Sequence, residues 1–155
     1  MNSLLQRSNP IDQGVDPAVI LSFIDSLKAD KLEMHGFMLA RHGHVIAEEW
    51  WEPYTPDVQH QLYSLSKSFT SIAVGFAISD GLLSINDPVV SFFPEYSTNL
   101  NESWATLSVR HLLTMSTGHQ SDTSGVMRKR TDGDWVAAFF EIPLSHKPGS
   151  CFIYN

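Results

Sequence analysis

The first regular pattern along the chain is helical. Asp16 and Pro17 suit the N-cap and the first turn of a helix. The apolar residues that follow recur three or four positions apart, as one face of a helix requires: Val19, Ile20, Phe23, Ile24 and Leu27. The spacing predicts a helix that begins at Pro17 and ends near Lys31.

Two short β-prone runs come next, at residues 36–40 and 45–51. Apolar side chains such as Phe37 and Val45 lie within them, and the polar stretch that joins them contains Gly43, a turn residue. The pattern predicts an antiparallel hairpin.

Helical spacing returns over residues 58–79 and closes at Gly81, since glycine readily takes the left-handed conformation beyond a helix end. Residues 119–132 are polar and predict a surface loop. Three further short helices are predicted behind capping or proline residues, at Pro88, Ser108 and Asp134. A mostly helical chain with an N-terminal strand pair favours an α+β fold.

Composition narrows the functional classes. At 155 residues with 43% hydrophobic content, the chain has the size and core of one domain. A net charge of -7 with only ten Lys and Arg argues against nucleic-acid binding. The single cysteine, Cys151, excludes an intrachain disulfide and fits a reducing compartment. With no signal peptide and no membrane-spanning stretch, we expect a cytoplasmic protein that does not bind membranes, unless a leader has been removed.

Ser64 and Lys67 form the candidate chemical centre. Positions three apart lie on one helix face, so the lysine amine can reach the serine hydroxyl. A serine becomes nucleophilic when an adjacent base takes its proton, and backbone N–H groups at a helix start can bind the resulting oxyanion. On these residues alone, a helix-capping serine beside a solvated lysine explains the pair equally well.

Four ordered segments resemble the serine β-lactamase and penicillin-binding-protein superfamily, and most closely its class C-like branch. That branch includes class C β-lactamases, DD-peptidases, certain esterases and amide hydrolases. The segments are residues 63–70 (YSLSKSFT), 80–89 (DGLLSINDPV), 108–118 (SVRHLLTMSTG) and 147–155 (KPGSCFIYN). Met115 stands where the family usually has histidine.

The resemblance implies a role for each matching residue. Ser64 would be the acylated nucleophile, Lys67 its base, and Tyr154 the group that relays a proton to the leaving group. It also implies a helical lobe beside an antiparallel sheet, no cofactor, and a small ester, amide or lactam substrate. Asn155 fills only the middle position of the family's Tyr-x-Asn triplet, and the Lys-Thr-Gly-like strand is absent from this sequence.

We therefore expect residues 1–155 to form the N-terminal part of one β-lactamase-like hydrolase domain, with the C-terminal part outside this sequence. A hairpin with an open edge invites self-association. The contrasting hypothesis is a non-catalytic domain or fragment that keeps the scaffold and serves as a binding module.

Other chemical signals are weaker. His42 and His44 flank a turn glycine without a third ligand nearby, so no metal site is predicted. Asp132 and Asp134 lack the further acidic positions of a calcium loop, and a helix cap explains them better.

Overall fold

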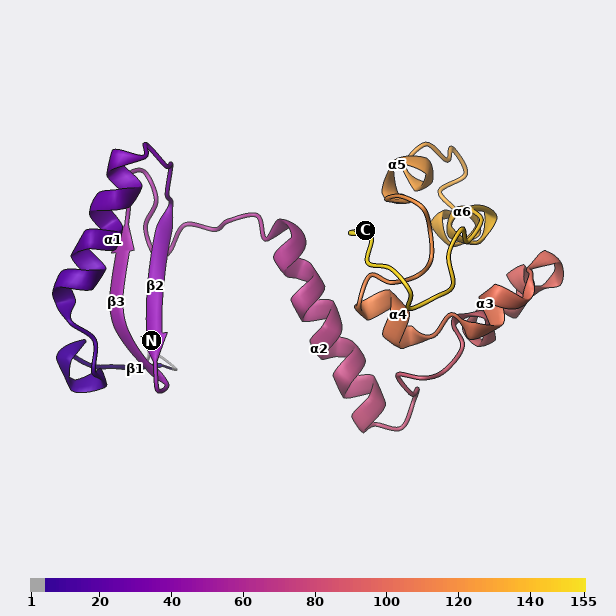
Figure 1. The fold of residues 1–155 in the computed structure, drawn as a ribbon, viewed down its shortest axis with the longest axis horizontal. Coiled ribbons are helices and arrows are strands. Elements are labelled where there is room, and N and C mark those ends of the chain that lie inside the picture. Colours follow the sequence, from indigo (N-terminus) through magenta and orange to yellow (C-terminus); the bar gives the residue numbers. More distant parts are fainter. Residues whose placement is uncertain (1–4) are drawn as a thin grey trace. The chain divides into compact units, whose positions relative to one another are not determined.

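The computed structural model describes residues 5–155, apart from the side chains of residues 98 and 99. The chain divides into two compact units, unit 1 (Met1–Gln61) and unit 2 (Leu62–Asn155). Figure 1 traces the elements of each unit. Helices together with a small mixed sheet confirm the α+β fold class.

Unit 1 opens with a 3₁₀ turn, η1 (Ile11–Gln13), and then helix α1 (Pro17–Ala29). The Asp16 side chain accepts a hydrogen bond of 2.9 Å from the Ala18 backbone N–H, as its capping role predicts. The helix ends just short of Lys31, whose positive φ of 54° cannot continue a right-handed helix.

The sheet of unit 1 has three strands in the order β1-β3-β2. The predicted hairpin is present as β2 (Gly36–Arg41) and β3 (His44–Trp50), and both turn residues between them, His42 and Gly43, have positive φ. The third strand, β1 (Gln6–Arg7), runs parallel to β3 and was not predicted. At two residues it is too short to carry an alternating pattern.

The interior of unit 1 lies between α1 and the sheet, which run side by side in Figure 1. Val45 and Ile46 of β3 are buried, and the Phe23 ring of α1 lies 5.7 Å from the Phe37 ring of β2. At the end of β3, the ring of Trp50 covers Gly36. A Cβ added at position 36 would lie 2.3 Å from a carbon atom of that ring.

Unit 2 begins with a 3₁₀ turn, η2 (Tyr63–Leu65), that leads into helix α2 (Ser66–Ser79). The prediction of a helix from residue 58 was wrong. Tyr63 has φ 44°, a left-handed conformation that a non-glycine residue adopts at a cost, and it breaks the helical path before Ser64.

The rest of unit 2 consists of short helical elements joined by turns. They are η3 (Val89–Phe92), η4 (Pro94–Asn99), α3 (Glu102–Thr106), α4 (Val109–Leu113), α5 (Ser124–Met127) and α6 (Trp135–Glu141). The helices predicted behind Pro88, Ser108 and Asp134 are η3, α4 and α6, although η3 is a 3₁₀ turn.

The core of unit 2 is an aromatic cluster. Val89, Trp104, Leu107 and Phe140 are buried together. The Phe140 ring lies 5.1 Å from the Trp104 ring and 5.6 Å from that of Tyr96. Burying rings of this size is the largest apolar contribution that a single side chain makes.

Most of residues 119–132 are exposed, as their polarity predicts, but the segment contains α5, and His119 and Thr123 are buried. Both buried residues have hydrogen-bond partners: His119 Nδ1 lies 2.9 Å from the Thr117 hydroxyl, and the Thr123 hydroxyl binds Asn155.

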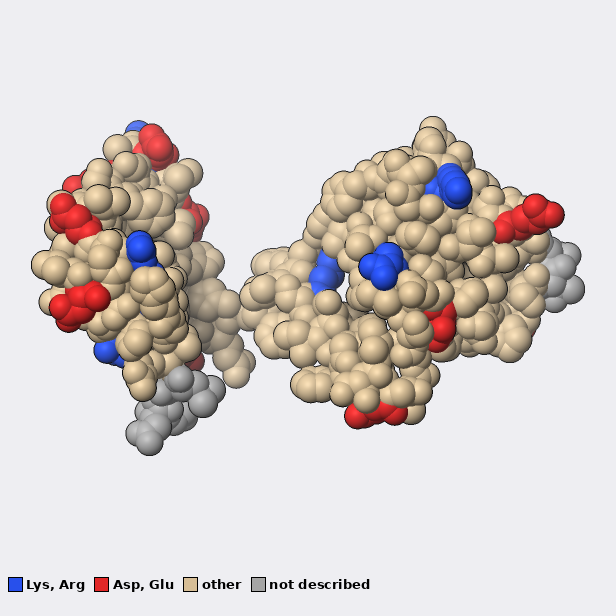
Figure 2. Space-filling view, turned by 60° about the horizontal axis from the view of Figure 1, so that its bottom comes forward, with Lys and Arg blue, Asp and Glu red and all other residues tan. Residues whose placement is uncertain are grey.

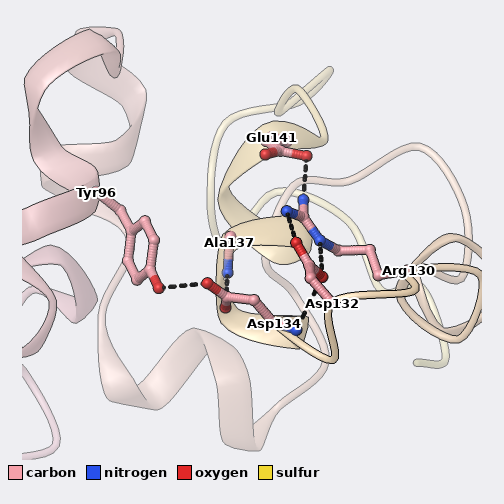
Figure 3. Close-up of polar contacts among 6 residues, drawn as sticks. All are labelled: Tyr96, Arg130, Asp132, Asp134, Ala137 and Glu141. Atoms are coloured by element: carbon pink, nitrogen blue, oxygen red, sulfur yellow. Dashed lines mark hydrogen bonds and ion pairs between the residues drawn. The ribbon is translucent and has the colours of Figure 1, made fainter.

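A polar network fixes the chain that enters α6 (Figure 3). Arg130 lies between Asp132 and Glu141, with nitrogen–oxygen distances of 2.7 and 2.6 Å. Asp134 caps α6 by accepting from the Ala137 N–H at 2.8 Å, and it also accepts from the Tyr96 hydroxyl at 2.8 Å. The capping interpretation of Asp134 is therefore confirmed.

Among residues 5–155, no helix is both long and apolar enough to cross a bilayer. On the face drawn in Figure 2, Lys and Arg side chains stand apart from one another and form no continuous stripe.

Candidate active site

Ser64 and Lys67 lie together at the junction of η2 and α2. Lys67 Nζ is 3.3 Å from Ser64 Oγ, as their spacing predicts for one helix face. Both side chains belong to exposed residues. Ser64 lies in the 3₁₀ turn before α2, where the N–H groups of Leu65 and Ser66 already donate to carbonyls of that turn. The positive end of the α2 dipole still favours negative charge near the serine.

Tyr154 completes the arrangement from the far end of the sequence. Its hydroxyl hydrogen-bonds to Ser64 Oγ and lies 3.4 Å from Lys67 Nζ. The hydrogen bond to Ser64, followed by that to Lys67, lowers the pKa of Tyr154 below its ordinary value. The three residues that the family resemblance singles out are thus brought together. A lowered pKa makes the phenol a better partner for proton exchange at this site.

Backbone pairing places the C-terminal segment against the turn that follows α4. Gly149 N–H donates to the Ser116 carbonyl at 2.8 Å, and Ile153 N–H donates to the Met115 carbonyl at 2.9 Å. Met115 takes part in this pairing through its backbone carbonyl. The pairing therefore does not require the histidine side chain that the family usually has at this position. Tyr154 therefore directly follows Ile153, a residue whose backbone is hydrogen-bonded to Met115.

Gly118 is required for this pairing. Its φ is 98°, and an added Cβ would come within 2.3 Å of the His146 carbonyl oxygen. The Gly118 carbonyl accepts from both Ser145 and His146 N–H groups at 2.9 Å. A side chain at position 118 would push the C-terminal segment away.

Thr123 and Asn155 form a contact that the sequence did not predict. The Thr123 hydroxyl and N–H both donate to Asn155 Oδ1, at 2.9 and 3.2 Å. The Asp122 carboxylate accepts from the N–H and hydroxyl of Ser124, the first residue of α5, in an Asx-type turn. An Asp two residues before a Ser is typical of such a turn, and it was the one local signal of order in this stretch.

A small hollow adjoins the candidate site on the α4 side of α2. Its volume is about 210 Å³, and Lys67, Asn155, Leu112 and Met115 are among its lining residues. The lining also includes the hydroxyl residues Thr70 and Ser71, so it combines polar and apolar side chains.

Within residues 5–155, no group of three or more His, Cys, Asp or Glu side chains is placed to hold a metal ion. Both ring nitrogens of His44 are occupied, by the His42 carbonyl at 3.0 Å and by Gln6 at 3.1 Å.

Parts of this chain are similar in sequence to known bacterial proteins. Protein flp of Staphylococcus aureus strain COL is 28% identical over 105 residues, and that of strain N315 is 30% identical over the same length. These matches cover 65% of this chain and 21% of the flp protein. A beta-lactamase of Yersinia enterocolitica is 33% identical over 66 residues, which cover 43% of this chain and 16% of that enzyme.

The chain thus spans about a fifth of the flp relatives that it matches. The sequence profile of the family described as Beta-lactamase matches residues 28–155. That range includes all four resembling segments and each of Ser64, Lys67 and Tyr154. The chain belongs to the Beta-lactamase family.

Proposed function

We propose that this protein is a serine hydrolase that acts on an ester, amide or β-lactam bond through an acyl-enzyme at Ser64. The observation that carries the proposal is the meeting of three groups: Lys67 Nζ and the Tyr154 hydroxyl both lie within hydrogen-bonding reach of Ser64 Oγ. A nucleophile with its base in reach, and the base held by a third group, is the arrangement that activates a serine.

In the acylation step, Ser64 Oγ bonds to the substrate carbonyl carbon. Its proton passes to Lys67 Nζ, the proposed base. Tyr154 touches both groups and relays that proton to the leaving nitrogen or oxygen as its bond to the carbonyl carbon breaks. The positive end of the α2 dipole stabilises the oxyanion of the intermediate.

Deacylation repeats the steps with water as the nucleophile. Water adds to the acyl carbonyl and gives its proton to the Lys67–Tyr154 pair. The bond from Ser64 Oγ to the acyl carbon then breaks, and Ser64 recovers a proton. The lowered pKa of Tyr154 supports the step in which the phenol donates its proton, because the phenol gives it up more readily.

Covalent labelling tests the proposal. The protein is incubated with a fluorescent fluorophosphonate or a fluorescent penicillin, and the adduct is located by mass spectrometry. We expect the label on Ser64 and none on Ser64→Ala. Ser68→Ala, a neighbouring serine on α2, is the matched control and should label like the wild type.

Three outcomes contradict the proposal. Labelling at another serine, or equal labelling of Ser64→Ala, would show that Ser64 is not the nucleophile. The absence of any adduct would favour the contrasting hypothesis of a binding module. A time course of release separates hydrolysis from a stable acyl adduct.

A further inference from the structure

Tyr154 is held in place mainly by the chain on either side of it. Its side chain is 53% exposed, so packing alone does not fix the ring. On one side, Ile153 N–H donates to the Met115 carbonyl at 2.9 Å. On the other, the Asn155 side chain binds Thr123. Tyr154 therefore lies between two residues that are each hydrogen-bonded to other parts of unit 2.

The Thr123–Asn155 contact is specific in its geometry. Both the hydroxyl and the backbone N–H of Thr123 converge on Asn155 Oδ1, at 2.9 and 3.2 Å. Because a backbone N–H can only donate, the Asn155 atom that it meets is the oxygen. Thr123 is only 3% exposed, so water competes little for either donor. A longer contact of 3.4 Å joins the same hydroxyl to Met127 Sδ.

We propose that Thr123 is a positioning residue for Tyr154, and that through Asn155 it holds the phenol against Ser64 and Lys67. The inference rests on the proposed function for its catalytic consequence. It extends that function to a residue that lies outside the motifs of the candidate site.

The groups around the phenol make its position measurable through the pKa of Tyr154. The groups that face the phenol are Ser64 and Lys67, which lower its pKa, and Asp122, whose negative charge raises it. If the Asn155 anchor is lost, the phenol moves away from Ser64 and Lys67. Its titration then shifts to higher pH. A residue that only supported the fold would lower stability without moving this titration.

The experiment compares Thr123→Val, which removes the hydroxyl, with Thr123→Ser, which keeps it. The matched control is Thr117→Val, since Thr117 is also buried and hydrogen-bonded but binds His119. Ionisation of Tyr154 is followed by ultraviolet difference titration against Tyr154→Phe, which identifies its signal among the four tyrosines. We expect an alkaline shift in Thr123→Val, and none in Thr123→Ser or Thr117→Val. An unshifted titration in folded Thr123→Val would overturn the proposal.

Asn155→Ala provides a second route to the same test, because it removes the acceptor and leaves the buried threonine in place. It should reproduce the alkaline shift, and an unshifted titration in this variant would also overturn the proposal. Thermal unfolding of every variant confirms that folded protein is compared.

The labelling rate of Ser64 provides the catalytic readout. We expect it to fall in Thr123→Val by up to about 100-fold, the loss that a misplacement of about 1 Å can cause. Thr123→Ser should restore it. If wild-type protein is not labelled at Ser64, the proposed function fails while the titration still decides the role of Thr123. A shifted titration with an unchanged labelling rate would overturn the catalytic consequence alone.

Discussion

Unit 2 contains two regions that are built in opposite ways. Around Trp104 and Phe140, side chains enclose one another and exclude water, with exposed fractions of 3% and 6%. At Ser64, Lys67 and Tyr154, the side chains are exposed and meet through polar contacts. Apolar burial contributes to stability in proportion to area, whereas exposed polar contacts contribute little. The enclosed region therefore maintains the fold, and the exposed one is free to serve chemistry.

The largest effect should come from Lys67→Arg. Arginine keeps the positive charge but cannot give up its proton near neutral pH, so it cannot act as the base. We expect labelling of Ser64 to slow by about 10²–10⁴, the usual contribution of a general base. The free energy of unfolding should stay within about 0.5 kcal/mol of the wild type. Lys129→Arg, an exposed lysine elsewhere in unit 2, is the control. Near-wild-type labelling of Lys67→Arg would refute the role of base.

Phe140→Ala should show the reverse pattern. Its ring packs against those of Phe93, Tyr96, Trp104 and Phe139. Removing such a ring from a closed cluster costs about 3–5 kcal/mol of stability. Denaturant unfolding measures the loss. The labelling rate of the remaining folded molecules should be unchanged, and a specific loss of labelling would show that the two regions are not separable.

The features that the sequence could predict are those that depend on residues close together in the chain. Ser64 and Lys67 are three positions apart, so local helix geometry was sufficient to place them together. Asp16 and Asp134 were predicted as caps because capping is local too. The expected contribution of Tyr154 depended on the family resemblance, since its distance along the chain gives no local signal.

Non-local features could not be predicted. The partner of β1 lies about forty positions away, with Gln6 opposite His44. The hydrogen bond from Thr123 to Asn155 joins residues 32 positions apart in the chain. Tyr63 breaks the helix by adopting a positive φ that no residue pattern announces. The expectations of a C-terminal remainder and of self-association through a strand edge stay predictions.

Acidification should weaken the enclosed region first. His119 is buried between the rings of Trp104 and Phe139, and burial lowers its pKa below the ordinary 6.5. Its Nε2 has no hydrogen-bond partner within the described chain. The unfolded chain therefore binds the proton more readily, so the contribution to stability is complete above pH 6.5 and is lost as the pH falls below it.

Thermal unfolding measured from neutral pH to about pH 5 checks this expectation. His119→Gln cannot take up the proton, so its unfolding temperature should fall less steeply with pH than that of the wild type. His146→Gln, at an exposed position, is the control and should keep the wild-type slope. Identical slopes in wild type and His119→Gln would contradict the expected role of His119.

The smallest effect should come from Asp132→Asn in the exposed network of Arg130. Arg130 holds the pKa of Asp132 well below its usual range, so this contribution is present above pH 3.8 and is lost as the pH falls through the lowered value. Because the Asp132 side chain is 54% exposed, salt should screen the pair. We expect a slight fall in unfolding temperature at neutral pH, much smaller than for Phe140→Ala, that disappears when salt is added. The Asp132 contribution changes at lower pH than that of His119. The Asp132 variant and the wild type should therefore respond alike between neutral pH and about pH 5. A large loss that persists in high salt would mean that the network is part of the enclosed region and that the division proposed for unit 2 is drawn in the wrong place.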